Sequence, residues 1–458
     1  MQIQTQRTRR TVRPESCDPA SLERSVRQLL ADKVSGNLVG LWLLIPEHLR
    51  LGTWDLLCGW SRESGERVQP RLALQLVHEA ALCSSGGLRH YRVLSQRGFE
   101  LANGLPFVAS DTAVHDLLAA HTVAQAQRLQ VALGQIRRAS GDYRGNLLAI
   151  DPHRRRSYSK RQMRRYRDDQ KTRAYKVAPT FFALDADTHQ PVCFTTATSA
   201  CTATTAAIEL LGLAAEILAP ESGQTLVLAD IEHLTSELFQ HVQSHTPFDL
   251  LVPMKNTCSL QKQLQAIPAD QFTRRWAGFA TTRQPYQMPS RDAGHLFQFV
   301  QRNGERPEEY RLGAFLSTSD REEVDTLTVE YPKRWHVEEF FNAHQALGWN
   351  RAGTLNLNIR YGQMTMALLA QAALQRLRHR LGQPFSDWDA GHLAKSLLEG
   401  LQGDVRVEED TIVVTYYNAP NVEQLRQHYE GLPGRLTSEH IDPHMPWLYG
   451  FKLDFRFR

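Results

Sequence analysis

Three acidic residues occupy positions that folding is expected to bring together. Asp151 ends a short apolar run that begins at residue 146, Asp230 ends a second one, 224–229, and Glu338 lies in a segment with helical spacing. In an α/β sheet the carboxyl ends of neighbouring strands meet at one edge, and a packed helix can add a third carboxylate. Carboxylates so close repel one another unless cations neutralise them, and such hard oxygen ligands suit Mg²⁺ or Mn²⁺. The pattern predicts two metal ions that promote phosphoryl transfer.

Each acid has an ordinary alternative interpretation when it is taken alone. An acid directly after a strand is most often a turn residue or a helix cap. An Arg/Glu pair four residues apart on a helix is usually a surface ion pair that contributes about 0.3–0.5 kcal/mol. The combination therefore carries more weight than any single residue.

The segment 331–347 is expected to be one helix that forms a wall of the site. Pro332 suits the first helical position, and neither Gly nor Pro follows it before residue 348. At 100° per residue Glu339 turns away from the polar stripe. That stripe contains Arg334, Glu338, Asn342 and Gln345. The apolar flank contains Val337, Phe340, Phe341, His344 and Leu347.

A basic segment follows Asp151 directly. Residues 153–176 contain eleven Lys or Arg and two acids, so this stretch has a net charge of +9. Because the whole chain has a net charge of +4, the remaining residues together carry −5. Interleaved tyrosines and clustered charge are typical of a surface that binds a phosphate backbone, although a solvated basic loop has the same composition. The candidate DNA contacts here are Arg154, Arg155, Arg156, Lys160, Arg161, Arg164 and Arg165.

The order of predicted elements indicates three regions. Residues 1–140 are mostly helical, 141–377 alternate strands and helices around a β-rich insertion at 255–330, and 378–458 form a small α+β region. Strands are expected in the insertion at 295–301, 310–316 and 326–329. Within the middle region two runs, 178–184 and 191–198, are expected to form a hairpin across the turn at 185–188. The predicted fold class is therefore α/β, with a mixed sheet flanked by helices.

Composition excludes several classes of protein. Hydrophobic residues make up 42% and charged residues 22% of the 458 residues, which argues against a disordered chain. The six cysteines show no C-x-x-C pair, and the longest apolar run, 38–45, is too short to span a bilayer. We expect a cytoplasmic protein without a membrane partner or a small-molecule substrate.

With these residues in place, the chain resembles the DDE transposases of the insertion-sequence family four group. Their signature is Tyr-x2-Arg-x3-Glu-x6-Lys, and Tyr331, Arg334 and Glu338 match it at the correct spacing. Asp151 in LLAID and Asp230 in LVLAD match the two aspartates, and the insertion lies where that group carries one. The resemblance covers about 141–377 and implies a ribonuclease H-like core, two Mg²⁺ or Mn²⁺ ions, cut-and-paste transposition, and a homodimer on paired DNA ends.

The resemblance also implies contacts to transposon-end and target DNA. Tyr331 and Arg334 would bind phosphate near the cleaved end, Lys255 would add a basic contact, and Trp276 would stack on an extruded base, unless it is a buried core residue. One position departs from the signature, because Gln345 replaces its lysine and supplies no charge. Lys333 and His344 are the candidates to replace that charge.

Two other functions fit the same residues. The first is a catalytically silent DNA-binding regulator, which Gln345 favours and the intact carboxylates oppose. The second is a ribonuclease H-like nuclease that hydrolyses strands without joining them.

Overall fold

The computed structural model describes most of the chain, as two compact units. The described residues are 18–36, 38–62, 68–83, 94, 96–157, 163, 165–167, 173–196, 201–288, 294–349, 354 and 356–458. Unit 1 combines Met1–Leu129, Ala343–Arg351 and Asn358–Arg458, and unit 2 combines Gln130–Asn342 and Ala352–Leu357. The first and the last described segments thus belong to one unit, and the division into three domains stays a prediction.

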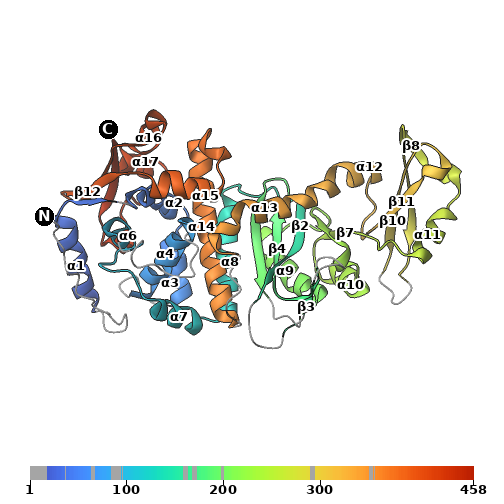
Figure 1. Cartoon of the computed structure of the whole chain (residues 1–458), viewed down its shortest axis with the longest axis horizontal. Coiled ribbons are helices and arrows are strands. Elements are labelled where there is room, and N and C mark those ends of the chain that lie inside the picture. Colours follow the sequence, from blue (N-terminus) through green and yellow to red (C-terminus); the bar gives the residue numbers. More distant parts are fainter. Residues whose placement is uncertain are drawn as a thin grey trace. The chain divides into compact units, whose positions relative to one another are not determined.

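A mixed sheet forms the centre of unit 2. Its first five strands lie in the order β5–β4–β2–β6–β7, with β2 antiparallel to β4 but parallel to β6, and β6 parallel to β7 (Figure 1). The predicted hairpin is present as β4 and β5, and a short strand, β3, pairs with the start of β4. The strand bounds are β2 Leu147–Arg156, β3 Arg165–Tyr166, β4 Tyr175–Asp185, β5 Gln190–Thr196, β6 Leu226–Ala229 and β7 Asp249–Pro253.

Two helices cover one side of these strands and form the core of unit 2 with them. The helix α9 (Ala203–Leu218) begins at Thr202, whose side chain caps it, and packs against β4 and β5. The next helix, α10 (Ser236–His245), packs against α9 and β7. Their buried Leu, Ala, Ile and Phe side chains join those of the strands in one apolar cluster. The preceding helix, α8, covers Val123–Ala139.

The β-rich insertion extends the same sheet. Its last strand pairs antiparallel with β7, and the other three follow it outward, so that β8 is an edge strand (Figure 1). The bounds are α11 Cys258–Gln265, β8 Thr273–Trp276, β9 Phe279–Tyr286, β10 Leu296–Asn303 and β11 Arg311–Ser317. The strand expected at 326–329 is wrong, because Thr326–Glu330 forms a π-helical turn after α12 (Glu323–Asp325). Periodicity cannot distinguish a short apolar strand from a short helix.

The segment 331–347 is less regular than a single α-helix. Tyr331–Trp335 forms a 3-10 turn, α13 covers His336–His344, and Gln345–Leu347 form a second 3-10 turn. The prediction of one continuous helix is therefore wrong, since the 3-10 turns wind more tightly than 100° per residue assumes.

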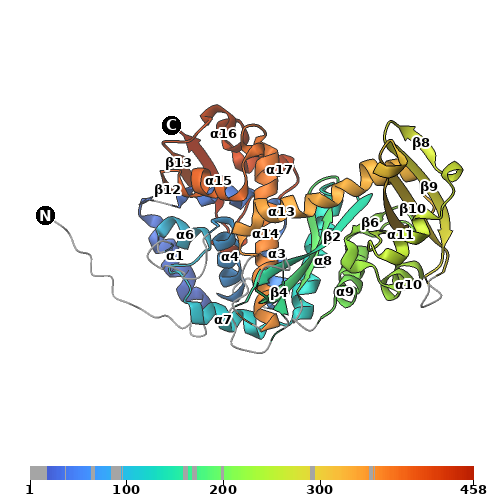
Figure 2. The same cartoon turned by 45° about the vertical axis from the view of Figure 1, so that its right-hand side comes forward.

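Unit 1 contains helices and a small sheet. The strands lie in the order β1–β12–β13–β14, where β13 and β14 are parallel and the other pairs are antiparallel (Figure 2). The side chain of Ser110 caps α7. The strands are β1 Val34–Gly36, β12 Gly403–Glu408, β13 Thr411–Tyr416 and β14 Lys452–Phe457. The helices are α1 Pro19–Ala31, α2 Ile45–Arg50, α3 Thr53–Ser61, α4 Val68–Ala81, α6 Arg97–Ala102, α7 Asp111–Ala120, α14 Leu357–Leu381, α15 Ala390–Leu393, α16 Val422–Tyr429 and α17 Leu432–Ser438.

Within the described residues, no helix has the length and apolar character needed to cross a lipid bilayer.

Candidate active site

The pairing of β2 with β6 brings two of the predicted acids together. The two strands run parallel, and Ile150 pairs with Ala229 at the last matched position. Asp151 directly follows Ile150, and Asp230 directly follows Ala229, so the two aspartates lie side by side where the parallel pairing ends. The expectation that the strand stops at Asp151 is wrong. On its other edge β2 continues to Arg156, because residues 148–156 pair with β4.

Asp230 also closes a turn. Its Oδ1 accepts hydrogen bonds from the backbone N–H of Glu232 (3.1 Å) and from Nδ1 of His233 (2.8 Å). The carboxylate thereby caps the 3-10 turn Ile231–His233, and the His233 ring is buried beneath it. The capping interpretation and the site interpretation are thus compatible for this residue.

The start of α13 is fixed to the sheet from two directions. Phe340 and Phe341 contact the ring of Phe182 on β4, with centroids 6.1 and 5.2 Å apart, and Phe341 also lies 4.3 Å from His153 on β2. Ahead of them, Lys333 forms an ion pair with Asp187 at 2.7 Å. These contacts set the position of Glu338.

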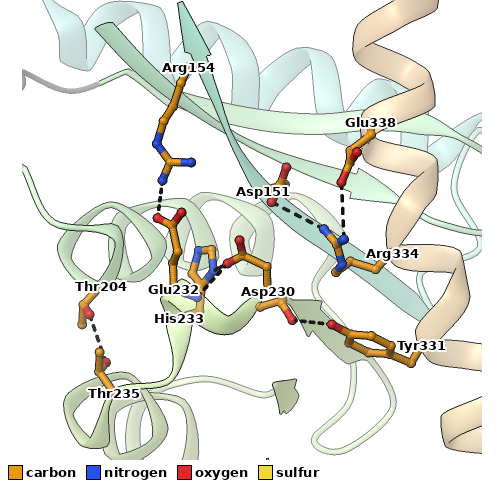
Figure 3. Close-up of polar contacts among 11 residues, drawn as sticks. Asp151, Arg154, Thr204, Asp230, Glu232, His233, Thr235, Tyr331, Arg334 and Glu338 are labelled. Atoms are coloured by element: carbon orange, nitrogen blue, oxygen red, sulfur yellow. Dashed lines mark hydrogen bonds and ion pairs between the residues drawn. The ribbon is translucent and has the colours of Figure 1, made fainter. Parts of the chain in front are cut away.

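Arg334 joins the carboxylates electrostatically. Its guanidinium lies 3.6 Å from the Asp151 carboxylate and 3.3 Å from that of Glu338, and Figure 3 shows these groups beside Asp230. The side chain is only 9% exposed. The predicted pairing of Arg334 with Glu338 is therefore present in the geometry, and the same guanidinium reaches Asp151 on the sheet.

Burial and neighbouring charges shift the pKa values of Asp151, Asp230 and Tyr331. Desolvation, followed by the charge of Asp230, raises the pKa of Asp151 from 3.8 to about 7, against the opposing effect of Arg334. For Asp230 burial also opposes ionisation, but the hydrogen bond and charge of His233 outweigh it and hold the pKa below its ordinary value. Burial raises the pKa of Tyr331 to about 12, and its hydroxyl donates to the Ala229 carbonyl at 3.4 Å.

The donor set fits a hard divalent cation. Asp151, Asp230 and Glu338 offer carboxylate oxygens, which are the ligands that Mg²⁺ and Mn²⁺ take in proteins. The pKa of Asp151 stays raised even though Arg334 lowers it, so the charge of Arg334 alone does not offset burial and the charge of Asp230. Additional positive charge at this place would stabilise all three carboxylates in their ionised form.

The basic residues predicted to contact DNA differ in their surroundings, and some of them lie outside the described part of the chain. Arg154 forms an ion pair with Glu232 and lies over the Tyr166 ring at 4.4 Å. Arg156 and Arg165 are exposed, and Arg156 lies over the Tyr175 ring at 4.3 Å. The side chain of Arg155 and the residues Lys160, Arg161 and Arg164 lie outside the described part of the chain.

Two predicted contacts from the insertion are solvent-accessible. Lys255 is exposed just after β7. Trp276, on the edge strand β8, is 49% exposed and stacks on Phe279 with centroids 4.4 Å apart. The alternative of a buried core tryptophan is therefore wrong.

Two residues were proposed to supply the charge of the missing signature lysine. One of them is paired with an acid, and the other is uncharged at neutral pH. Lys333 is paired with Asp187. Burial and Arg378 lower the pKa of His344 to about 4, which leaves that ring neutral at neutral pH. Gln345 follows the end of α13 and belongs to unit 1, so the structure does not place it relative to the site.

Two features near the carboxylates were not predicted from the sequence. Trp335 is 55% exposed, and the Arg334 guanidinium lies 4.8 Å from its ring centroid. His189 stacks on His336 across 147 positions of sequence, next to Glu339. The place of Trp335 directly after Arg334 was a usable signal, whereas the histidine pair arises only from packing.

Comparison with known proteins identifies the class. Residues 142–372, just over half of the chain, match the transposase DDE domain. The chain therefore belongs to the transposase DDE domain family, whose members generally use divalent metal ions. No curated protein matches the chain.

A solved transposase structure is among those similar to this chain. A piggyBac transposase synaptic complex with hairpin DNA, studied by cryo-electron microscopy, aligns over 78% of this chain and 79% of its own. The two are 11% identical with a TM-score of 0.38, too low to establish a shared arrangement.

Proposed function

We propose that this transposase performs cut-and-paste transposition of an insertion sequence. It binds terminal inverted repeats, cleaves the DNA at the transposon ends and joins the free 3′-hydroxyl to target DNA. The observation that carries the proposal is the register of β2 and β6, which sets Asp151 beside Asp230, while Arg334 connects Asp151 to Glu338.

We propose further that the core is ribonuclease H-like and of the insertion-sequence family four type. The mixed order β5–β4–β2–β6–β7 supports this fold, since a three-stranded antiparallel part adjoins two parallel strands with acids at the junction. The signature residues support the type, because Tyr331 and Arg334 lie beside the two aspartates and Arg334 also pairs with Glu338.

In this function Asp151, Asp230 and Glu338 hold two Mg²⁺ or Mn²⁺ ions. When bound, such ions activate an attacking oxygen and stabilise the leaving oxygen of a phosphodiester. Arg334 balances the charge of the carboxylates and is near enough to contact a phosphate beside them. The Tyr331 hydroxyl stays neutral because of its raised pKa, and on DNA binding it exchanges its long hydrogen bond to the Ala229 carbonyl for one to such a phosphate.

The DNA partner is supported by charge and exposed aromatic surface. Arg156 on β2 and Arg165 on β3 are exposed on either side of β4, and Trp335 is 55% exposed next to Arg334. Cations of this kind bind the phosphate backbone, and exposed tryptophans stack on unpaired bases. We propose that two copies act on paired ends, and that Gln345 weakens phosphate binding relative to a lysine.

The experiment uses duplex oligonucleotides that carry the inverted repeats flanking the gene. Cleavage and joining in Mg²⁺ are followed on denaturing gels, and binding by gel shift. We expect Asp151→Asn, Asp230→Asn and Glu338→Gln to lose cleavage while still binding DNA. The matched control is Glu237→Gln, an exposed acid on α10 outside the site, which should cleave at the wild-type rate.

Other outcomes would overturn the proposal. Strand transfer by any of the three variants would exclude that residue from catalysis. Hydrolysis by the wild-type protein without joining would identify a nuclease. Specific binding without any cleavage would identify a silent regulator.

A further inference from the structure

Two histidines and a glutamate gather at the first turn of α13, away from the carboxylates of the candidate active site. A ligand nitrogen of His189, one of His336 and a carboxylate oxygen of Glu339 all lie within 4.8 Å of one another. The two imidazole rings are stacked, with centroids 3.8 Å apart and planes 27° from parallel. His189 comes from the turn between β4 and β5, and the other two from the first turn of α13.

The hydrogen bonding of His336 prepares one nitrogen as a ligand. Its Nδ1 lies 2.7 Å from the carbonyl oxygen of Ala186, which can only accept, so Nδ1 carries the proton. In the neutral ring Nε2 then holds the free lone pair. A backbone carbonyl that binds the second nitrogen of a metal-binding histidine is a recurring arrangement, because it fixes both the tautomer and the ring orientation.

The turn that carries His189 is held firmly. Asp185, fully buried, accepts hydrogen bonds from the backbone N–H groups of Asp187 and Thr188, and Asp187 pairs with Lys333. His189 itself adopts a left-handed conformation (φ 57°), which non-glycine residues rarely do. The turn therefore presents this ring to α13 in a defined place.

We propose that His189, His336 and Glu339 bind one transition-metal ion of the zinc type. Two imidazoles and a carboxylate are a ligand set that zinc takes with a water in the fourth position, whereas Mg²⁺ prefers oxygen ligands alone. Around a tetrahedral zinc the ligand atoms lie about 3.3 Å apart. The exposed side chains of His189 and Glu339 can close the remaining gap by rotation.

The ion would brace the active-site helix. Consecutive residues of a helix point about 100° apart, so Glu338 faces the carboxylates while Glu339 faces this cluster. A metal held by His189 and Glu339 ties the first turn of α13 to the β4–β5 turn. It thereby restricts the helix that carries Glu338, without taking part in the reaction itself.

Metal binding by tag-free, chelator-treated protein tests the proposal. The background is the full chain with Asp151→Asn and Asp230→Asn, so that the carboxylate site does not compete. Zn²⁺ affinity is measured by competition with a dye, and the ligand type from the absorption spectrum with Co²⁺. We expect one tight site, and at least about tenfold weaker binding after His189→Ala or Glu339→Gln.

A second histidine pair provides the matched control. His241 and His245 on α10 also stack, with centroids 5.2 Å apart, but the described residues place no third ligand with them. His241→Ala should leave Zn²⁺ affinity unchanged. Zn²⁺ should also raise the melting temperature of the background protein but not that of its His189→Ala form, while both melt alike without metal.

Three results would overturn the proposal. The first is unchanged Zn²⁺ affinity in the His189→Ala or Glu339→Gln protein. The second is a loss of affinity with His241→Ala. The third is a sulfur-to-metal charge-transfer band with Co²⁺, which would place the ion on a cysteine.

Discussion

The buried carboxyl of Asp151 makes a quantitative prediction about stability. Its side chain is 14% exposed, and its pKa is raised from 3.8 to about 7 in the folded protein by burial and by Asp230. The unfolded chain therefore releases this proton first as the pH rises. Ionisation favours unfolding between about pH 4 and 7, and stability falls across that window.

The size of the effect follows from the two pKa values. Linkage gives a cost of about 2 kcal/mol at pH 5 and about 4 kcal/mol at pH 8, so the cost grows by about 2–3 kcal/mol between the two pH values. Asp151→Asn keeps the shape and cannot ionise, so it removes this cost. We expect the variant to be more stable than the wild type, and by a larger margin at pH 8 than at pH 5.

The measurement is urea unfolding of both proteins in EDTA at pH 5 and pH 8. The expected result is a variant-minus-wild-type difference in unfolding free energy that grows by about 2–3 kcal/mol between the two pH values. Glu237→Gln, an exposed acid, serves as the control and should give the same difference at both. A variant that is less stable than the wild type at pH 8, or a difference independent of pH, would refute the reasoning.

Three further substitutions test the surroundings of the site by urea unfolding at pH 7. Arg334→Gln leaves carboxylates without their cation and should cost about 3 kcal/mol, and a cost below about 1 kcal/mol would show that the pairing is weak. Asp185→Ala removes the acceptor for the backbone N–H groups of residues 144, 145, 187 and 188 and should cost at least about 3 kcal/mol, whereas an unchanged stability would contradict the hydrogen bonding. Gly134→Ala places a Cβ 2.6 Å from the Ile217 side chain and should cost about 1–3 kcal/mol despite the better helix propensity of alanine, and a stabilised variant would contradict the close packing.

The local sequence was sufficient to locate the strands that carry the two aspartates. The apolar runs before Asp151 and Asp230 are short, and the residues between them alternate strand and helix patterns, so parallel neighbours were predictable. The end of β2 was not predictable, because Arg154–Arg156 look like a charged loop. They remain in the strand since β4 supplies backbone partners that the sequence of β2 does not reveal.

Contacts between residues that are far apart in the sequence could not be predicted. Arg334 and Glu338 are four residues apart and their pairing followed from helical spacing, but the approach of Arg334 to Asp151 depends on how α13 packs on the sheet. The same packing brings His189 to His336. Neither pattern shows in a linear sequence, because each depends on the aromatic contacts of Phe340 and Phe341 with Phe182.

Replacement of each carboxylate by cysteine tests most directly whether Asp151, Asp230 and Glu338 hold the catalytic metal ions. Thiolate is a poor ligand for Mg²⁺ but accepts softer ions better. In the end-cleavage assay we expect Asp151→Cys, Asp230→Cys and Glu338→Cys to be inactive in Mg²⁺ and to regain measurable cleavage in Mn²⁺. Wild-type cleavage in Mg²⁺ by any of them, or equal inactivity of all three in both ions, would contradict a shared metal site.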